Sequence, residues 1–528
     1  MVTAVATPQL RNGAELFIGL VAGLGTDHNL LTEILTEALV SFGYQTELIR
    51  LAQLLHNYER YKSLPAEPAD VYIKQHQQAG NEFRRITKSD DSMAVLGVGA
   101  IQEARVRVNG SKEKPIPNCA YILRSLKTPE EVKTLRSIYG TAFLLVGSSA
   151  PYDLRRRFLA SRIAASHHSF QHDQYRSVAE MLIQLDQEEV GKEYGQNLRN
   201  AFHRSDIFVD ASDARRLRDS IERGLELVFG NTFHTPSRDE HGIFHATGVA
   251  LRSAELGRQV GSAICTEDGD VVAVGTNEVP KAGGGQYWTG DDPDHREFMM
   301  REDSNDRHKR SLLADLLSRL KADGWLNSEK ARLNPDELAD LALSVEKSPE
   351  VSDARLTDLI EFMRAVHAEM AALIDAARRG VSVANATMYV TTFPCHLCAP
   401  HIVASGIRRV VYIEPYAKSL ALQLYPDSIS VDSVETKGNQ VRFEPFVGVA
   451  PRMYINLFTM MDRKGDDGKV IQFDRKKAVL RHPGSPRAYL ANEVAAMSKL
   501  EEIIQKEQLK IEQQEFKYDE SRNLQTTL

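Results

Sequence analysis

Two short motifs in the second half of the chain constrain its fold more than any other feature. The first is His367-Ala-Glu369, and the second is Pro394-Cys-His-Leu-Cys398, whose first cysteine follows His367 by 28 residues. Cysteine and histidine are preferred zinc ligands, and three protein ligands leave the fourth position of the ion open for water. A fold that gathers His367, Cys395 and Cys398 around one zinc ion therefore contains a catalytic metal site rather than a structural one.

The use of cysteine supports this interpretation. The chain has four cysteines in 528 residues, too few for a disulfide framework, so we expect reduced thiols. A CxxC pair alone would also suit a redox centre or half of a structural zinc knuckle. No second CxxC occurs, and the upstream histidine supplies a third ligand. His396, inside the motif, is expected to be exposed and not to bind the metal.

The order H-x-E…P-C-x-x-C is typical of zinc deaminases, which replace the amino group of a cytosine or an adenine by oxygen from water. Glu369 is then the group that moves protons from water to the ring nitrogen and the leaving ammonia. Pro400 is tolerated only in the first turn of a helix, so we expect the cysteines at the start of a short helix that runs to Ser405. A helix N-terminus favours thiolates.

The first half of the chain follows a different pattern, and we assign residues 1–235 to one domain. A hydrophobic strand from Glu15 to Val21 leads into a glycine-rich turn, then an amphipathic helix and a second strand at 42–50. Strand, turn, helix and strand in this order open a parallel α/β domain. Later strands are predicted at 120–123 and 141–146.

We assign residues 236–440 to a second domain with an insertion at about 281–350. The predicted elements are a helix through about 251–257, a hairpin over 260–276, a helical part of the insertion around 312–320, a helix over 357–379, and strands at 387–393 and 409–413. The intervening helix and strand bring the two motifs together.

Residues 441–528 are predicted to form a C-terminal extension that ends in a charged helix at about 490–516. Its thin apolar stripe consists of Val494, Met497, Leu500, Ile504 and Ile511. We expect this helix to pack on its own subunit, with an oligomer contact as the alternative.

Charge and hydropathy narrow the range of partners. The formal charge is −7, from 65 basic and 72 acidic residues, which argues against a strongly basic surface for nucleic acid. The sequence contains no uninterrupted apolar run of 18 or more residues, so it predicts no membrane span. The N-terminus lacks a secretory pattern. We expect a cytoplasmic protein with no membrane partner.

Further motifs carry a family resemblance over residues 240–415. Arg252-Ser, Arg258-Gln-Val-Gly-Ser-Ala-Ile and Gly275-Thr-Asn277-Glu-Val-Pro, together with the two zinc motifs, resemble the deoxycytidylate deaminase family. The resemblance implies a three-layer α/β/α cytidine-deaminase fold, Zn²⁺ as cofactor and a free deoxycytidine nucleotide as substrate. It implies that Asn277 contacts the sugar and that Arg258 lies in the substrate-binding region, although Thr276 and Glu278 replace the usual neighbours of that asparagine.

The whole chain resembles a narrower group, the bacterial anti-phage dCTP deaminases, which join a P-loop-kinase-like domain to the deaminase domain. The segment from Ile413 to Leu420, the insertion and the C-terminal extension carry this likeness. It implies conversion of dCTP to dUTP and ammonia, with dCMP to dUMP as a second reaction, and so depletion of dCTP in antiviral defence. It also implies a homo-oligomer. We expect a regulated enzyme, gated by the first domain or the insertion, with an inhibitory RNA or a phage-derived trigger as partner.

The glycine-rich turn departs from an active kinase motif. A Walker A motif reads G-x-x-x-x-G-K-[ST]. With Thr26 at its last position, Gly19 fits the first, but Leu24 and Gly25 replace the second glycine and the lysine. The loss of the lysine argues against phosphoryl transfer. Backbone N–H groups of Gly19, Gly23, Gly25 and Thr26 at a helix start could still hold a phosphate. Nucleotide sensing and a scaffold role both remain open.

Two other functions remain open. A polynucleotide deaminase acting on a cytidine or adenosine base would need a basic channel with aromatic platforms, which −7 net charge and 7% aromatic residues do not favour. A regulated interaction protein that binds an RNA or a phage factor would use the first domain.

Overall fold

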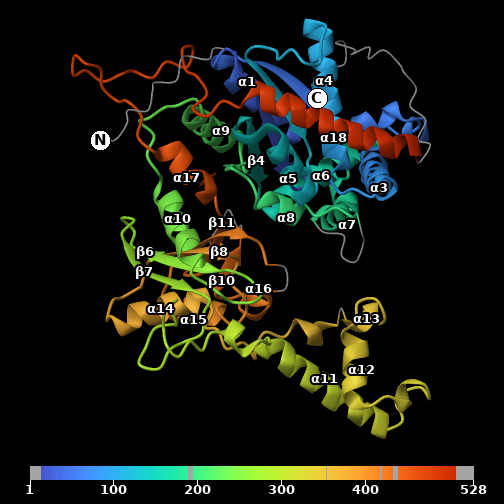
Figure 1. Cartoon of the computed structure of the whole chain (residues 1–528), viewed down its shortest axis with the longest axis vertical. Coiled ribbons are helices and arrows are strands. Elements are labelled where there is room, and N and C mark those ends of the chain that lie inside the picture. The colour runs from blue at the N-terminus through green and yellow to red at the C-terminus, as the bar shows by residue number, and fades with distance from the viewer. Residues whose placement is uncertain (1–12, 188–193, 353, 417–418, 432–437, 507–528) are drawn as a thin grey trace. The chain divides into compact units, whose positions relative to one another are not determined.

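The computed structural model describes residues 13–187, 194–352, 354–416, 419–431 and 438–506. The chain divides into two compact units. The first contains residues 1–235 and 447–528, and the second contains residues 236–446. Each unit is built around a six-stranded sheet of its own (Figure 1).

The sheet of the first unit is mostly parallel. Its strand order is β12-β5-β4-β1-β3-β2, and only the edge strand β12 pairs antiparallel to its neighbour. The central strand is buried along its whole length, as expected for a parallel strand covered on both faces. The strands are β1 (Leu16–Ala22), β2 (Gln45–Arg50), β3 (Cys119–Arg124), β4 (Phe143–Ser149), β5 (Ile207–Asp210) and β12 (Gly448–Val449).

Helices cover both faces of this sheet. Successive side chains of β1 therefore point alternately into two hydrophobic cores, one on each face. Ile18 and Leu20 face the helices α1 and α9, and Phe17 and Val21 face α4 and α5. The helices of this unit are α1 (His28–Ser41), α2 (Leu51–Leu54), α3 (Ala69–Thr87), α4 (Ser92–Asn109), α5 (Pro129–Tyr139), α6 (Tyr152–Ser166), α7 (Arg176–Gln187), α8 (Leu198–Phe202), α9 (Ala214–Val228), α17 (Pro451–Phe458) and α18 (Pro486–Lys506).

The C-terminal helix α18 belongs to the first unit. Leu500 and Ile504 are buried in the core beside α4, and Met497 packs against the same core. Arg105 of α4 is fully buried and forms ion pairs with Glu493 of α18 at 2.6 Å and with Glu15 at 2.8 Å. The helix therefore packs on its own chain. Val494 of the predicted stripe is exposed, and Ile511 lies outside the described residues.

The second unit has a mixed sheet with the order β10-β11-β9-β8-β6-β7. The hairpin β6–β7 is antiparallel, β6 pairs antiparallel with β8, and β8, β9, β11 and β10 are parallel. Strand β11 is thus part of this sheet, while the chain from Val447 onward packs with the first unit. The strands are β6 (Gly261–Cys265), β7 (Val271–Thr276), β8 (Thr387–Thr392), β9 (Arg409–Glu414), β10 (Ile429–Val431) and β11 (Val441–Pro445).

This sheet also lies between two helical layers. Gly242 of α10 packs on the ring of Tyr389, whereas the neighbours Met388 and Val390 on β8 face the core shared with α14 and α15. Both units are α/β, as predicted. The helices are α10 (Arg238–Ala250), α14 (Ala368–Arg378), α15 (Ala399–Ala404) and α16 (Ala421–Leu424).

The bridge between Glu278 and Val366 closes the insertion, which therefore runs to residue 365, beyond the predicted end at about 350. It contains α11 (Ser304–Ala322), α12 (Pro335–Leu343) and α13 (Pro349–Ser352). Arg310 on α11 forms ion pairs with Asp336 and Asp340 on α12. The helical part predicted around 312–320 is therefore the middle of a longer helix.

Two helices are shorter than predicted, for reasons that bear on the site. Helix α10 ends at Ala250, because the Ser253 hydroxyl donates to the Asn277 carbonyl and the Ala254 N–H donates to the Glu278 carboxylate. Helix α14 begins only at Ala368, and the residue before His367, Val366, donates instead to the Glu278 carbonyl. The predictions of helix at 251–257 and at 357–367 were wrong.

None of the helices in the described parts of the chain combines the length and the apolar character needed to cross a bilayer.

Candidate active site

Three potential metal ligands converge where two helices of the second unit begin. His367 is the N-cap residue of α14, and Cys398 is the N-cap residue of α15. Cys395 lies in the turn before α15. Its carbonyl closes this turn by accepting from the N–H groups of Cys398 and Ala399. His367 Nδ1 is 3.2 Å from Cys395 Sγ and 3.4 Å from Cys398 Sγ. The zinc ligands predicted from the two motifs are thus brought together.

The spacing of these atoms fits a tetrahedral zinc ion. The three ligand atoms lie within 4.8 Å of one another, and they are the one such group of His, Cys and acidic residues among the described residues. A nitrogen and a sulfur ligand on tetrahedral zinc lie roughly 3.5 Å apart, given bond lengths of about 2.0 and 2.3 Å. The residues present therefore fit the metal that the motifs predict.

The two thiols affect each other's ionisation. The hydrogen bond from Cys398 and the neighbouring His367 lower the pKa of Cys395, whereas the adjacent Cys395 and burial raise the pKa of Cys398. Without a cation, one thiolate opposes the formation of the other. A divalent ion would allow both to ionise, because its charge balances two thiolates.

Glu369 lies in the first turn of α14 and is 4% exposed. Burial and then the neighbouring Cys395 raise the pKa of Glu369 to about 7. A carboxyl group with a pKa near neutral pH can both accept and return a proton, as a general acid–base residue must. The same neighbourhood acts on His367: burial opposes its protonated form, but Cys395, Glu369 and Glu255 together raise its pKa.

A glycine lets α14 approach the sheet closely enough to form the site. A Cβ atom on Gly275 of β7 would lie 2.3 Å from the Ala368 carbonyl oxygen and from the Ala372 nitrogen. Only glycine fits at this position. The segment after β7 continues the link, since the Glu278 carbonyl accepts from the N–H of Val366.

Asn277 and Arg258, the predicted substrate-binding residues, lie together. Asn277 is 5% exposed; its Oδ1 accepts from the Val260 N–H at 2.8 Å and its Nδ2 donates to the Arg258 carbonyl at 2.7 Å. Asn277 therefore shapes the loop that carries Arg258. The Arg258 guanidinium is largely exposed and lies 3.6 Å from Glu414, at the end of β9. Because β8 ends at the same edge, Arg258 lies on the side of the sheet from which Cys395 follows.

Sequence reasoning missed Glu255. Burial and the carboxylates of Glu297, Asp303 and Glu278 raise its pKa to about 7, and its charge acts on His367. The only signal in the sequence was an acidic residue three positions before Arg258. Its carboxylate neighbours come from the loop after β7 and from the insertion, and this proximity exists only in the fold.

The base of the insertion is tied to the segment that precedes His367. Glu297 is 3% exposed and accepts from the Ser304 N–H at 2.7 Å and from Arg364 Nη1 at 3.0 Å. Asn305 donates to the Leu359 carbonyl and accepts from the Phe362 N–H. These contacts hold the extended chain that leads into the metal ligand.

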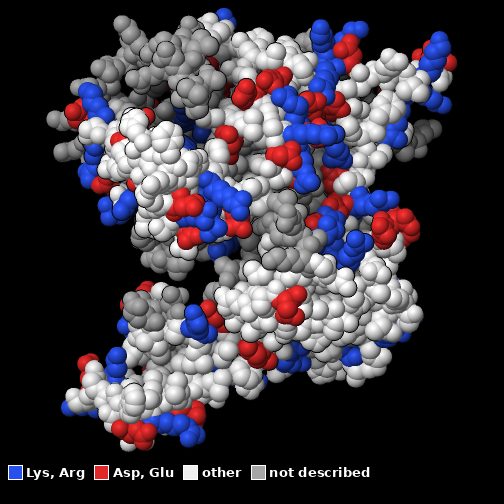
Figure 2. All heavy atoms as spheres, turned by 180° about the vertical axis from the view of Figure 1, so that it is seen from behind, with Lys and Arg blue, Asp and Glu red and all other residues white. Residues whose placement is uncertain are grey.

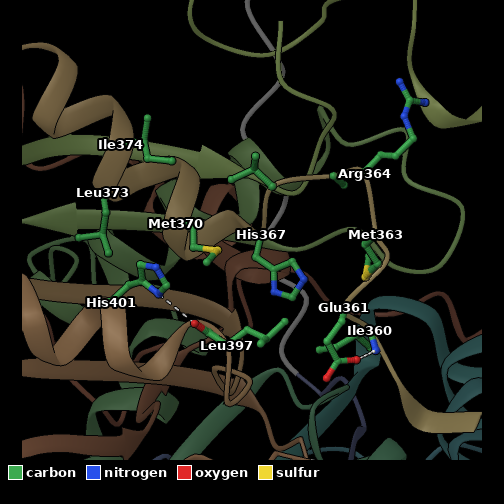
Figure 3. A pocket seen from close by; sticks show the side chains of 12 residues that line it. Ile360, Glu361, Met363, Arg364, His367, Met370, Leu373, Ile374, Leu397 and His401 are labelled. Atoms are coloured by element: carbon green, nitrogen blue, oxygen red, sulfur yellow. Dashed lines mark hydrogen bonds between the residues drawn. The ribbon is translucent and has the colours of Figure 1, made fainter. Parts of the chain in front are cut away.

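A cavity of about 370 Å³ lies beside His367, on the outer face of α14. Figure 3 shows the His367 imidazole between the side chains of Met370 and Met363. Neither Glu369 nor a cysteine lines this cavity, so it borders the metal site from outside. Its lining is Ile360, Glu361, Met363, Arg364, Ala365, Val366, His367, Met370, Leu373, Ile374, Leu397 and His401.

His396 differs from the prediction. Its side chain is 20% exposed, and Nε2 lies 3.9 Å from Glu361. It is partly buried because the turn between the two cysteines packs against the end of the insertion. Among the described residues, it does not belong to the cluster of three potential ligands.

The predicted nucleotide-binding residues of the first unit fall into two places. Gly19 lies inside β1, where a Cβ would collide with Leu126, Phe143 and Leu145, so it serves the core. Gly23, Gly25 and Thr26 lie in the turn after β1, and Gly25 has φ +89°.

The partners of this turn come from the chain itself. The Arg155 backbone fills the space beside Gly25, and the Leu24 N–H donates to Asp186.

Comparison with known proteins concerns the second unit. Residues 236–414 match the family model of the cytidine and deoxycytidylate deaminase zinc-binding region. The deoxycytidylate deaminase of Enterobacteria phage T2 is 52% identical over 54 residues, which are 10% of this chain and 29% of the relative. ComE operon protein 2 of Bacillus subtilis (strain 168) is 38% identical over 77 residues, 14% of this chain and 39% of the relative. The chain thus spans well under half the length of these relatives.

Solved structures resemble the chain only weakly. The dCMP deaminase of cyanophage S-TIM5, solved in apo form and in complex with dCMP and dUMP, is aligned over 40% of this chain and 100% of its own. The two structures have sequence identities of 15% and 16% and TM-scores of 0.21 and 0.22.

Proposed function

We propose that the second unit, whose residues 236–414 match the cytidine and deoxycytidylate deaminase zinc-binding region, hydrolyses the amino group of a free deoxycytidine nucleotide. The observation that carries the proposal is one cluster: His367, Cys395 and Cys398 within ligand distance of one another, with the buried Glu369 beside them. The reaction consumes one water and releases one ammonia, and the cytosine becomes uracil.

Each residue has a distinct part in this reaction. His367, Cys395 and Cys398 hold the zinc ion, which when bound acts as a Lewis acid that lowers the pKa of water. Glu369 takes one proton from the attacking water and passes it to the ring nitrogen, and then moves the remaining proton of the added hydroxyl to the leaving amino group, which departs as ammonia. Its burial excludes bulk water from these transfers, which strengthens the electrostatic interactions.

For the substrate, we infer dCTP, with dCMP as a second substrate. The exposed Arg258 guanidinium at the edge of the site supports recognition of a phosphate group. Within the described parts of the chain, the second N–H of Asn277 Nδ2 makes no bond beside the one to the Arg258 carbonyl, and that N–H is available to a sugar hydroxyl. The choice of the triphosphate rests on the resemblance of the whole chain to dCTP deaminases.

Free nucleotides suit the surface better than a polynucleotide does. On the face seen in Figure 2, lysine and arginine side chains are interspersed with aspartate and glutamate. A polynucleotide track needs a continuous basic groove. The net charge of −7 points the same way.

The biological role that we propose is depletion of dCTP during phage infection, by a homo-oligomer under control of a phage-derived trigger or an inhibitory RNA. A strain that carries Glu369→Ala should lose protection, because only proton transfer is removed. Plaque counts together with cellular dCTP would test this. Protection that persists in the Glu369→Ala strain would favour a role as an interaction protein.

The direct biochemical test is a panel of deoxynucleotides and ribonucleotides incubated with the zinc-loaded full chain, with ammonia and uracil products as the readout. ATP, dTTP and dGTP should be added in parallel to expose small-molecule control. We expect product from dCTP and less from dCMP. If no cytosine nucleotide yields product under any condition, the proposal is wrong.

A further inference from the structure

Two arginines stand side by side at the carboxyl edge of the first unit's parallel sheet. Arg50, the last residue of β2, is the register partner of Arg124, the last residue of β3, and Arg124 is also paired with Leu20 of β1. Side chains alternate along a strand. Ile122 and Leu48 pack into the core under α1, so Arg124 and Arg50, two positions later, belong to the same face. Arg124 confirms this direction by donating to Asn29 of α1 at 2.8 Å.

Further positive charge gathers at this edge. Burial, and then Arg50 and Arg162 of α6, lower the pKa of Arg124 to about 10. Burial and then Arg124, Lys127 and Arg162 hold the pKa of His28 well below its ordinary value.

The acidic groups close by are already engaged. Asp186 pairs with Lys127 at 2.5 Å, and Asp27 caps α1 by accepting from the N–H groups of Asn29 and Leu30. In the described residues, no carboxylate forms an ion pair with Arg50, Arg124 or Arg162.

Unpartnered hydroxyl groups lie at the same edge. Thr26, in the turn between β1 and α1, is 4% exposed, and its Oγ1 has no hydrogen-bond partner among the described residues. Ser148 is 1% exposed, is the register partner of Ala22 at the end of β1, and likewise has an unpartnered Oγ. Like Val146, it faces the α1 side. A buried hydroxyl without a partner destabilises the fold, and such a group calls for an explanation such as a bound ligand.

The position within the fold is suited to a ligand. In the order β2-β3-β1-β4-β5, the chain crosses from one side of β1 to the other, and open α/β sheets bind ligands at the carboxyl ends beside such a crossover. The glycine-rich turn offers little backbone here, because Asp186 accepts from the Leu24 N–H and Arg155 fills the space beside Gly23 and Gly25. Recognition would therefore depend on side chains.

We propose that this edge of the first unit is a phosphate-binding site, formed by Arg50, Arg124 and Arg162 with the Thr26 hydroxyl, that takes the phosphate groups of pyrophosphate or of a nucleotide. The arginines supply the charge that the missing lysine of the turn does not, and guanidinium groups bind phosphate oxygens in a bidentate manner. The site is separate from the metal cluster, so it stands or falls independently of the deaminase activity.

The test is calorimetric titration of the full chain with inorganic phosphate, pyrophosphate and ATP. Arg50→Gln and Arg162→Gln alter exposed side chains, so the fold should survive. Each should weaken pyrophosphate binding by roughly tenfold or more, as expected for the loss of one charge-assisted hydrogen bond. Arg215→Gln, on the exposed surface of α9, is the matched control and should bind like the wild type.

Thr26→Val distinguishes a ligand contact from a structural role. It removes a buried hydroxyl that has no hydrogen-bond partner among the described residues, so the melting temperature should stay the same or rise while pyrophosphate binding weakens. ATP that binds more tightly than pyrophosphate would identify a nucleotide as ligand, and equal affinity would identify the phosphate groups alone. The proposal is overturned if none of the three probes binds at millimolar concentration, or if Arg50→Gln and Arg162→Gln bind like the wild type.

Discussion

Glu369 and His367 lie in the same turn at the start of α14, but their substitution should have different consequences. His367 contributes a ligand atom within hydrogen-bonding distance of both cysteines, whereas Glu369 acts on protons. Activity and metal content therefore report on different residues.

For Glu369→Gln, we expect kcat to fall by roughly 10²–10⁴-fold, the usual contribution of a general acid–base residue, because an amide cannot carry the proton. Zinc content, measured by mass spectrometry of the metal, should remain at the wild-type level. His367→Ala should lose both zinc and activity. A Glu369→Gln enzyme with kcat near the wild-type value would refute the assigned role.

Arg258 offers a second test at this scale. If its guanidinium binds a substrate phosphate, Arg258→Gln should raise KM for dCTP by roughly tenfold while kcat changes little, because the lost contact is made equally in ground state and transition state. Arg319→Gln, an exposed arginine on α11, is the control. An unchanged KM would remove Arg258 from the binding site.

Among the elements, the insertion is connected to the site through Glu297. Burial opposes ionisation of this carboxyl, but the bonds from Ser304 and Arg364 outweigh it and lower its pKa. A carboxyl group whose pKa is lowered in the folded state stabilises the fold at pH values above its ordinary pKa of about 4.5. This stabilisation is lost as the pH falls through the folded-state pKa.

We therefore expect Glu297→Gln to lower the free energy of unfolding of the insertion by about 1–3 kcal/mol at neutral pH. The difference from the wild type should disappear in acid. Both tryptophans of the chain, Trp288 and Trp325, lie in the insertion, so their fluorescence during urea unfolding reports on it directly. A difference that persists unchanged at acidic pH would contradict the assignment.

The docking of α18 depends on a buried charge network. Glu493→Ala leaves Arg105 buried with one carboxylate fewer, and breaking such a pair costs about 3–5 kcal/mol. Hydrogen exchange over residues 486–506 should accelerate accordingly. Lys499→Ala, on the exposed side of the same helix, should change stability by no more than about 0.5 kcal/mol. Equal exchange in the two variants would mean that the network does not hold the helix.

On the scale of the whole molecule, the spacing of apolar residues and of the metal-ligand motifs predicted the features that depend on local sequence. The α/β class, the strands around the site and the convergence of His367, Cys395 and Cys398 follow from periodicity and ligand chemistry. The ends of α10 and α14 could not be predicted, because Glu278 and Asn277 stop these helices through contacts that form only in the folded chain.

The first unit shows the same limit. Gly19 matched a phosphate-loop position in the sequence, but its neighbours in the fold make it a core residue. Conversely, Arg50 and Arg124 are 74 positions apart, and no sequence motif connects them. The register of β2 and β3 places them side by side. Charge clusters assembled by strand pairing have no signature in a single sequence.

The measurement that tests the central claim most directly is a competition assay. Zinc-loaded full chain is mixed with dCTP, dCMP and a cytosine-containing oligonucleotide together, and uracil products are quantified by mass spectrometry, with Glu369→Gln in parallel. We predict uracil in the free nucleotides, with dCTP consumed first, and none with the variant. Uracil only in the oligonucleotide, or equal product from wild type and variant, would contradict the account.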